Sequence, residues 1–184
     1  TTTDISEKQL KIAQSRAASL GLEIDFVRAD AADLSSLPDE RFELVCSTNG
    51  FFVWIADLDR VFAEVYRLLR PGGFYVFYDV HPFQRPWQDQ VQPIQMAKTY
   101  WDTGPYESND DVQSFEFTWT LADLLNPLAE AGLRLTKIAE SPAADSSFWE
   151  GHSYQPGERP SLLDWNENRR AGLPVWLTVA ARKA

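Results

Sequence analysis

The fold is decided by the stretch Arg70-Pro71-Gly72-Gly73-Phe74-Tyr75-Val76-Phe77-Tyr78, where a turn precedes an apolar run. Upstream of it, apolar side chains recur at offsets of three and four after Asp57, which predicts an amphipathic helix with Asp57 as its cap. Helices end before proline, and glycine accepts the backbone angles of a tight turn, so residues 70–73 predict a turn. Residues 74–78 are apolar at every position, as in a central strand covered on both faces.

Two further strand and helix signals lie upstream. Ser6 and Gln9 have the spacing of a capping box, which predicts a helix that Gly21 ends. Alternating apolar residues predict a strand over residues 22–30, and residues 42–47 have the composition of a short buried strand. These upstream helix and strand signals alternate in the same way as the helix, turn and strand around residues 57–78.

Downstream, residues 80–118 interrupt the alternation with prolines, amides and aromatic side chains. Thr120 predicts the start of a further helix, and residues 133–138 and 175–181 predict two strands. Only the irregular segment 141–173 joins these strands, so the last strand can run antiparallel to its neighbour. We expect one α/β domain over residues 1–184, with a mainly parallel sheet, helices on both faces and an antiparallel last strand.

Composition excludes several classes of function. The chain has 184 residues, a hydrophobic fraction of 44% and a net charge of −10, which suit one globular domain that repels nucleic acid. No apolar run reaches the ~20 residues of a membrane span and no signal peptide is visible, so we expect a cytoplasmic protein without a membrane partner. Cys46 is the one cysteine, which excludes an internal disulfide and a multi-cysteine metal site. Its apolar neighbours predict a buried core residue, with a reactive thiol as the alternative.

Residues that follow the predicted strands are candidate ligand contacts, because ligands of open α/β sheets bind beyond the carboxyl ends of strands. The carboxylate of Asp4, between a strand and a helix, can accept hydrogen bonds from two ribose hydroxyls. Asp30 can accept from an adenine amino group while the N–H of Ala31 donates to a ring nitrogen. The alternatives are a charge favoured by the helix dipole for Asp4 and a solvated loop acid for Asp30.

Four short motifs follow one another within residues 1–80: Asp4-Ile5-Ser6, Asp30-Ala31-Ala32-Asp33-Leu34, Phe42-Glu43-Leu44-Val45 and Leu69-Arg70-Pro71-Gly72-Gly73. This ordered set resembles the class I S-adenosylmethionine-dependent methyltransferases. The resemblance implies a Rossmann-like sheet and S-adenosyl-L-methionine as cofactor. It implies that Asp4 and Ile5 contact the ribose of the cofactor and that Asp30 and Ala31 contact its adenine. Ser47 and Thr48 would lie near its methionine part.

One part of the family pattern is missing from the chain: its first strand and glycine-rich loop. That strand lies in the middle of the family's sheet, so the strands ending at Asp4 and Ser47 would have no common neighbour. Residues 1–4 have the pattern of a strand end, and residue 1 is Thr rather than Met. We therefore expect either that the full protein supplies a preceding unit of about 30 residues or more, or that this fragment is compromised. The sequence Thr48-Asn49-Gly50-Phe51 replaces the Asn/Asp-Pro-Pro-aromatic motif of DNA-base and protein-glutamine methylases, which argues against those substrates.

The implied reaction is in-line displacement, in which an acceptor attacks the sulfonium methyl group. His81 is the predicted catalytic base, with His152 as a second candidate. The alternative for His81 is a hydrogen-bonded histidine in a turn beside Pro82.

Insertions at residues 80–118 and 141–173 are expected to form a cap over a small organic acceptor. Its apolar pocket is predicted to include Trp54, Phe83, Trp87 and Trp101. The alternative is that each ring packs in an ordinary core.

Two other classes of protein share parts of this pattern. A nicotinamide-dependent oxidoreductase would also use an acid at Asp4, although the chain has no convincing Tyr/Lys, Cys or His signature of that chemistry. A non-catalytic nucleotide-binding protein on the same sheet is the other alternative, because a fold does not fix a function.

Overall fold

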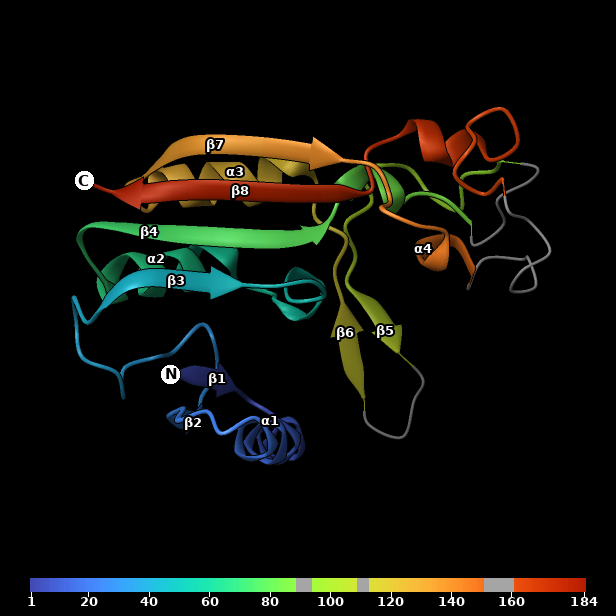
Figure 1. The fold of residues 1–184 in the computed structure, drawn as a ribbon. Coiled ribbons are helices and arrows are strands. Elements are labelled where there is room, and N and C mark those ends of the chain that lie inside the picture. Colours follow the sequence, from blue (N-terminus) through green and yellow to red (C-terminus); the bar gives the residue numbers. More distant parts are fainter. Residues whose placement is uncertain (89–93, 109–112, 151–160) are drawn as a thin grey trace.

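The computed structural model describes residues 1–88, 94–108, 113–150 and 161–184. The helices and strands follow in the order β1 (Thr2–Asp4), α1 (Glu7–Ser19), β2 (Phe26–Arg28), β3 (Phe42–Ser47), α2 (Leu58–Leu68), β4 (Leu69–Val80), β5 (Tyr106–Ser108), β6 (Ser114–Glu116), α3 (Leu121–Glu130), β7 (Leu133–Ser141), α4 (Ser147–Glu150) and β8 (Trp176–Lys183) (Figure 1). Short 3-10 helices lie at η1 (Phe52–Trp54), η2 (Pro82–Gln84) and η3 (Arg169–Gly172). None of the helices in these ranges is long and apolar enough to cross a bilayer.

The main sheet has four strands in the order β3-β4-β8-β7. β3 and β4 are parallel, whereas β8 runs antiparallel to both β4 and β7. The prediction of an antiparallel last strand is therefore confirmed, as is the mixed α/β class.

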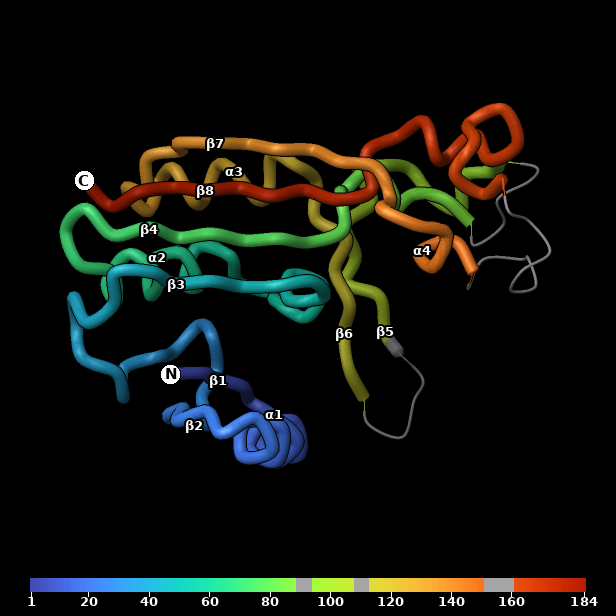
Figure 2. The backbone as a smooth tube through the Cα atoms, viewed as in Figure 1, coloured from blue at the N-terminus to red at the C-terminus, as the bar shows by residue number. Residues whose placement is uncertain are grey.

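β1 and β2 form a separate, parallel two-stranded sheet (Figure 2). Within the described ranges β1 pairs only with β2, and β3 pairs only with β4. As expected from the order of the motifs, the strands ending at Asp4 and Ser47 share no neighbour here. Each keeps one edge without a ladder of hydrogen bonds.

The predicted helix starts are confirmed by their caps. The hydroxyl of Ser6 accepts from the N–H of Gln9 at 3.3 Å, and the carboxylate of Asp57 accepts from the N–H of Arg60 at 3.0 Å. Thr120 begins α3 with a capping box. Each cap satisfies a backbone donor that the first turn of a helix leaves unpaired.

α2 and α3 pack against each other and lie on the same side of the main sheet (Figure 1). The core between them contains Phe62, Tyr75, Phe77 and Leu128, all buried. The alternate residues of the strands point to the opposite face, where Leu44, Phe74 and Tyr78 are exposed.

Cys46 shows how strand alternation decides burial. It pairs with Val76 in the face that α2 and α3 do not cover, and its side chain is exposed. The prediction of a buried core cysteine was therefore wrong. An apolar neighbourhood in the sequence does not say which of the two sheet faces a residue occupies.

The predicted turn at residues 70–73 lies inside β4 as an interruption of its pairing with β3. The register shifts between the pairs Phe42 with Leu69 and Leu44 with Phe74. Gly72 has a φ of +81°, in the left-handed region that favours glycine. The upstream helix ends at Leu68, as predicted. The strand predicted over residues 22–30 is shorter and covers only Phe26–Arg28.

Candidate functional site

The carboxyl ends of β1, β3 and β4 point in the same direction (Figure 1). β3 and β4 are parallel, so Ser47 and the residues after Val80 lie at one edge of the main sheet. This edge is where the rule for open α/β sheets places a ligand.

Asp4 lies at the end of β1, and its carboxylate is partly committed. Oδ1 accepts from the N–H of Ser6 at 2.7 Å, which holds the side chain at the start of α1. For Oδ2, the described residues give no hydrogen-bond partner. The neighbouring Ile5 is 64% exposed, so its side chain is accessible. One oxygen of Asp4 is thus fixed and the other is available to a hydroxyl donor.

Asp30 and Ala31 begin a tight turn after β2. Oδ1 of Asp30 accepts from the N–H of Ala32 at 2.9 Å, and its carbonyl oxygen accepts from the N–H of Asp33 at 2.9 Å. Ala31 is half-buried against the main core. The turn therefore presents the Asp30 carboxylate and the backbone of Ala31 from a fixed position.

Arg67 of α2 holds the loop over residues 30–39 in place. Its guanidinium donates to the carbonyl oxygens of Leu34 and Leu37, each at 2.8 Å. It also forms ion pairs with Glu64 at 2.7 Å and Asp39 at 2.6 Å. The hydrogen bond from Arg67 lowers the pKa of Glu64, so this carboxylate stays ionised at neutral pH.

Ser47 ends β3 in contact with β4. Its hydroxyl oxygen lies 2.5 Å from the hydroxyl oxygen of Tyr75. Burial raises the pKa of Tyr75, which keeps its hydroxyl protonated and able to donate. The following residue, Thr48, is exposed, and its carbonyl oxygen accepts from the N–H of Phe51. Ser47 is therefore fixed, while Thr48 presents its side chain outward.

Asp79 is a buried acid to which the sequence reasoning gave no role beyond its place after an apolar run. Its side chain is 3% exposed, and it accepts from the N–H groups of Gly50 at 3.1 Å and Phe52 at 3.3 Å. Arg85 forms an ion pair with it at 3.6 Å. Residues 75, 77 and 79 share the core-facing side of β4. A carboxylate at a core-facing position needs hydrogen-bond donors, so the alternation along this strand was the sequence signal that could have identified Asp79.

His81 is fully buried, and both ring nitrogens are engaged. Nδ1 accepts from the N–H of Phe83 at 3.1 Å, and Nε2 lies 2.8 Å from Oε1 of Glu140. This pattern requires the tautomer with a proton on Nε2, and burial lowers the pKa of the ring. The geometry is that of a histidine hydrogen-bonded in a turn. The predicted base role would require one of these bonds to open. His152 lies outside the described residues.

The predicted acceptor aromatics are mostly exposed. Trp54 is 55%, Phe83 43% and Trp101 77% exposed, so these rings are not part of an ordinary core. Trp87 is half-buried, and its indole N–H donates to the carbonyl oxygen of Phe83 at 2.5 Å. The structure thus brings Phe83 and Trp87 together.

Tyr100, to which the sequence reasoning gave no site role, links two of the predicted rings. Its ring centroid lies 5.3 Å from that of Phe83 and 5.1 Å from that of Trp101. Its hydroxyl accepts from the N–H of Leu121 at the start of α3, at 2.8 Å. Phe83, Tyr100 and Trp101 thus form one aromatic ladder, to which Trp54 makes no ring contact among the described residues.

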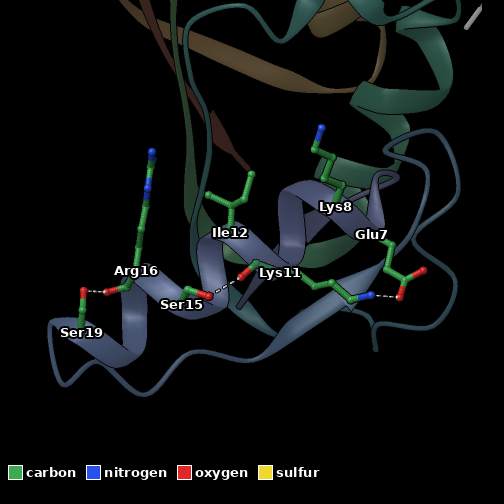
Figure 3. A pocket seen from close by; sticks show the side chains of 7 residues that line it. All are labelled: Glu7, Lys8, Lys11, Ile12, Ser15, Arg16 and Ser19. Atoms are coloured by element: carbon green, nitrogen blue, oxygen red, sulfur yellow. Dashed lines mark hydrogen bonds and ion pairs between the residues drawn. The ribbon is translucent and has the colours of Figure 1, made fainter. Parts of the chain in front are cut away.

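A cavity of about 820 Å³ lies elsewhere, along α1. Glu7, Lys8, Lys11, Ile12, Ser15, Arg16 and Ser19 line it (Figure 3). None of the predicted cofactor or acceptor residues is among them. Three or more His, Cys, Asp or Glu side chains that could hold a metal ion are not found together in the described ranges.

Comparison with known proteins relates the first part of the chain to a family by sequence. Residues 1–77 match the family described as Methyltransferase domain. Over 79 residues the chain is 38% identical to the demethylmenaquinone methyltransferase of Thermus thermophilus, which covers 43% of this chain and 35% of that protein. The chain thus spans about a third of the length of this curated relative.

The fold extends the likeness over nearly the whole chain. An S-adenosylmethionine-dependent methyltransferase from Mesorhizobium loti superposes with a TM-score of 0.66 at 23% identity, covering 98% of this chain and 78% of that one. The [4+2]-cyclase SpnF superposes with a TM-score of 0.62 at 20% identity, covering 98% of this chain and 65% of that one. At these identities the likeness shows the fold. Residues 1–77 therefore match a methyltransferase domain by sequence, and the chain shares the fold of S-adenosylmethionine-dependent methyltransferases.

Proposed function

We propose that this protein transfers a methyl group from S-adenosyl-L-methionine to a small organic acceptor. The observation that carries the proposal is the position of the six predicted cofactor residues. All of them fall within residues 1–77, where the sequence matches the methyltransferase domain. Asp4 and Ser47 end parallel strands and Asp30 follows one, and the Asp4 oxygen for which the described residues give no donor suits a ribose hydroxyl.

The chain's own residues bind and align the reactants. Asp4 and Ile5 take the ribose, Asp30 and Ala31 take the adenine, and Ser47 and Thr48 lie beside the methionine part. When bound, the cofactor supplies a methyl group that is already activated on a sulfonium. The protein therefore contributes proximity and in-line orientation, which can be a large part of the rate enhancement. A base is needed only for an acceptor that carries its proton at working pH, and His81 is the candidate.

The aromatic ladder Phe83, Tyr100 and Trp101 supports an apolar or aromatic acceptor. Its exposed rings offer a surface for stacking, and Trp54 and Trp87 extend the set of predicted acceptor contacts. The curated relative from Thermus thermophilus acts, by its name, on demethylmenaquinone, which is also a small organic molecule. We propose that residues 80–118 and 141–173 form the acceptor cap of one domain that works in the cytoplasm.

A further strand between β1 and β3 would complete this site. The motivation is that each of these strands has one unpaired edge in the described structure. A parallel strand with a glycine-rich loop at its carboxyl end would join the two sheets and bring the loop beside the methionine part.

Ligand binding and turnover distinguish the proposed function from two alternatives. A nicotinamide-dependent oxidoreductase would be stabilised by its dinucleotide, and a non-catalytic binding protein would bind without turnover. The fold is shared with a protein named as a [4+2]-cyclase, so turnover, rather than fold, identifies the reaction.

The decisive test is calorimetric titration of S-adenosylhomocysteine into the full protein, beside the Asp4→Ala variant and the matched control Asp25→Ala. We expect binding that weakens at least about tenfold in Asp4→Ala, because the ribose loses a charged acceptor. Asp25 is an exposed acid before β2, and its variant should bind like the unchanged protein. Absence of binding by the unchanged protein would overturn the proposal. Transfer of labelled methyl across an acceptor panel then identifies the substrate.

A further inference from the structure

The loop over residues 48–55, which connects β3 to α2, is held from two sides. On one side it donates backbone N–H groups to Asp79 of β4. On the other side it offers carbonyl oxygens to the segment that follows β6. The N–H of Phe117 donates to the carbonyl oxygen of Val53 at 2.8 Å, and Nε1 of Trp119 donates to that of Ile55 at 3.0 Å. The 48–55 loop is thus an intermediate layer between the sheet and the proposed cap.

Every polar group near the Asp79 carboxylate that the structure gives is a donor. The N–H groups of Gly50, Phe52 and Val80 and the guanidinium of Arg85 all face it. The two carboxylate oxygens divide these donors: Oδ1 accepts from Gly50 and Val80, and Oδ2 accepts from Phe52. An amide would turn an NH₂ group toward one of these donors. The position therefore requires a carboxylate rather than a side chain of the same shape.

Two features of the 48–55 loop connect its attachment to Asp79 with the position of the proposed cofactor residues. Gly50 has a φ of +82°, so the chain turns sharply at the residue that Asp79 holds. The turn follows directly on Ser47 and Thr48, the residues proposed to lie beside the methionine part. A small displacement of Gly50 would be transmitted over two residues to Thr48.

We propose that Asp79 is a positioning residue for methyl transfer: it fixes the 48–55 loop so that the cofactor residues at the end of β3 keep one geometry relative to the cap residue Phe117 and the adjoining Trp119. Asp79 acts through the loop and does not itself contact the reactants. The inference rests on the proposed function, which assigns Ser47 and Thr48 to the cofactor.

The test compares the full protein with Asp79→Asn and a matched control, Asp57→Asn. Asp57 caps α2 directly after the loop, and asparagine is an equally good cap, so this control loses the same charge with little change in stability. S-adenosylhomocysteine should bind about tenfold more weakly to Asp79→Asn and unchanged to Asp57→Asn. Hydrogen exchange at the amides of Gly50 and Phe52 should become at least about tenfold faster in Asp79→Asn, while amides of α2 and α3 keep their protection.

A merely structural role predicts a different result: protection would fall throughout the core, and the affinity of the folded fraction would stay the same. Equal affinity and equal exchange in Asp79→Asn would overturn the inference. If Asp79→Asn does not fold, hydrogen exchange in the unchanged protein tests the inference instead. Its Gly50 and Phe52 amides should exchange slowly, and more slowly with S-adenosylhomocysteine; fast exchange at both would overturn the inference. Failure of the unchanged protein to bind would instead overturn the proposed function, together with the cofactor part of this inference.

Discussion

His81 and Glu140 join the carboxyl ends of β4 and β7 across the strand β8 that separates them. Nε2 of His81 lies 2.8 Å from Oε1 of Glu140, and the ring is fully buried whereas the carboxylate is half exposed. Burial lowers the pKa of His81 below its ordinary value of 6.5, and the bond to Glu140 opposes this shift only in part. The folded protein therefore keeps this histidine neutral at a pH where the unfolded chain is protonated.

This difference predicts a stability that falls on acidification. Below pH 6.5 the unfolded state binds a proton that the folded state excludes, so the free energy of unfolding should decrease from about pH 6.5 downward, by at most about 1.4 kcal/mol per pH unit. Above pH 6.5 His81 should contribute no slope. Urea unfolding between pH 5.5 and 7.5 measures the effect, and His81→Gln should have a smaller slope. Equal slopes in the two proteins would contradict the prediction.

Arg67 should stabilise both the fold and the adenine side of the site. Arg67→Met removes hydrogen bonds to Leu34 and Leu37 and the ion pair with Glu64, at an expected cost of about 1–2 kcal/mol in the free energy of unfolding. The matched control is Arg70→Met, because Arg70 pairs with Glu43 on the surface and such pairs contribute little. S-adenosylhomocysteine should also bind more weakly to Arg67→Met, since the loop that carries Asp30 loses its anchor.

The same variant has a pH signature. Arg67 holds the pKa of Glu64 below its ordinary value of 4.5. This contribution to stability is present above pH 4.5 and is lost as the pH falls through the folded-state pKa. The difference in stability between Arg67→Met and the unchanged protein should therefore be largest above pH 4.5 and become smaller in stronger acid, where the lost bonds to the carbonyl oxygens of Leu34 and Leu37 account for the remainder. A constant difference at all pH values would show that Glu64 is not involved.

The pair Ser47 and Tyr75 should be energetically coupled. Removing either hydroxyl leaves its partner without a hydrogen bond, so Tyr75→Phe and Ser47→Ala should each cost about 0.5–1.5 kcal/mol. The double variant should lose less than the sum of the two single variants. Chemical unfolding of the four proteins measures this coupling, and strict additivity would mean that the bond contributes nothing to stability.

Trp101 should matter for the acceptor and not for the fold. Its side chain is 77% exposed, so Trp101→Ala should change the free energy of unfolding by less than about 0.5 kcal/mol. Under the proposed function the KM for the acceptor should rise at least about fivefold, as expected for an aromatic anchor. Trp101→Phe keeps a ring and should stay close to the unchanged protein. An unchanged KM in Trp101→Ala would show that the aromatic ladder is not part of the acceptor site.

Local signals in the sequence were sufficient to predict the helices α1, α2 and α3 and the strands of the main sheet, but not β5, β6 or α4, which lie in segments expected to be irregular. Ser6, Asp57 and Thr120 each start a helix because a cap needs only a side-chain oxygen and a donor three residues later. The antiparallel last strand followed from the short connection before it. The end of α2 at Leu68 followed from Pro71 and the glycines after it.

Features that depend on distant contacts were not predicted. Asp79 and the 48–55 loop are separated by 27 and 29 residues in the two bonds that join them, and Arg67 reaches carbonyl groups 30 and 33 residues away. Such partners are set by how strands pair rather than by spacing in the chain. The burial of His81 and the exposure of Cys46 likewise depend on what covers each position in three dimensions.

The attachment of Phe117 and Trp119 to residues 53 and 55 also limits how this protein can be redesigned. Grafting residues 81–120 from a homologue would keep the flanking elements β4 and α3 but would bring a new segment against the old carbonyl oxygens of Val53 and Ile55. A transplanted segment without matching donors would leave these groups unsatisfied. The smallest segment that can be exchanged between homologues therefore comprises two separate stretches, residues 48–55 and residues 81–120. In a chimera, both stretches should come from the same parent protein.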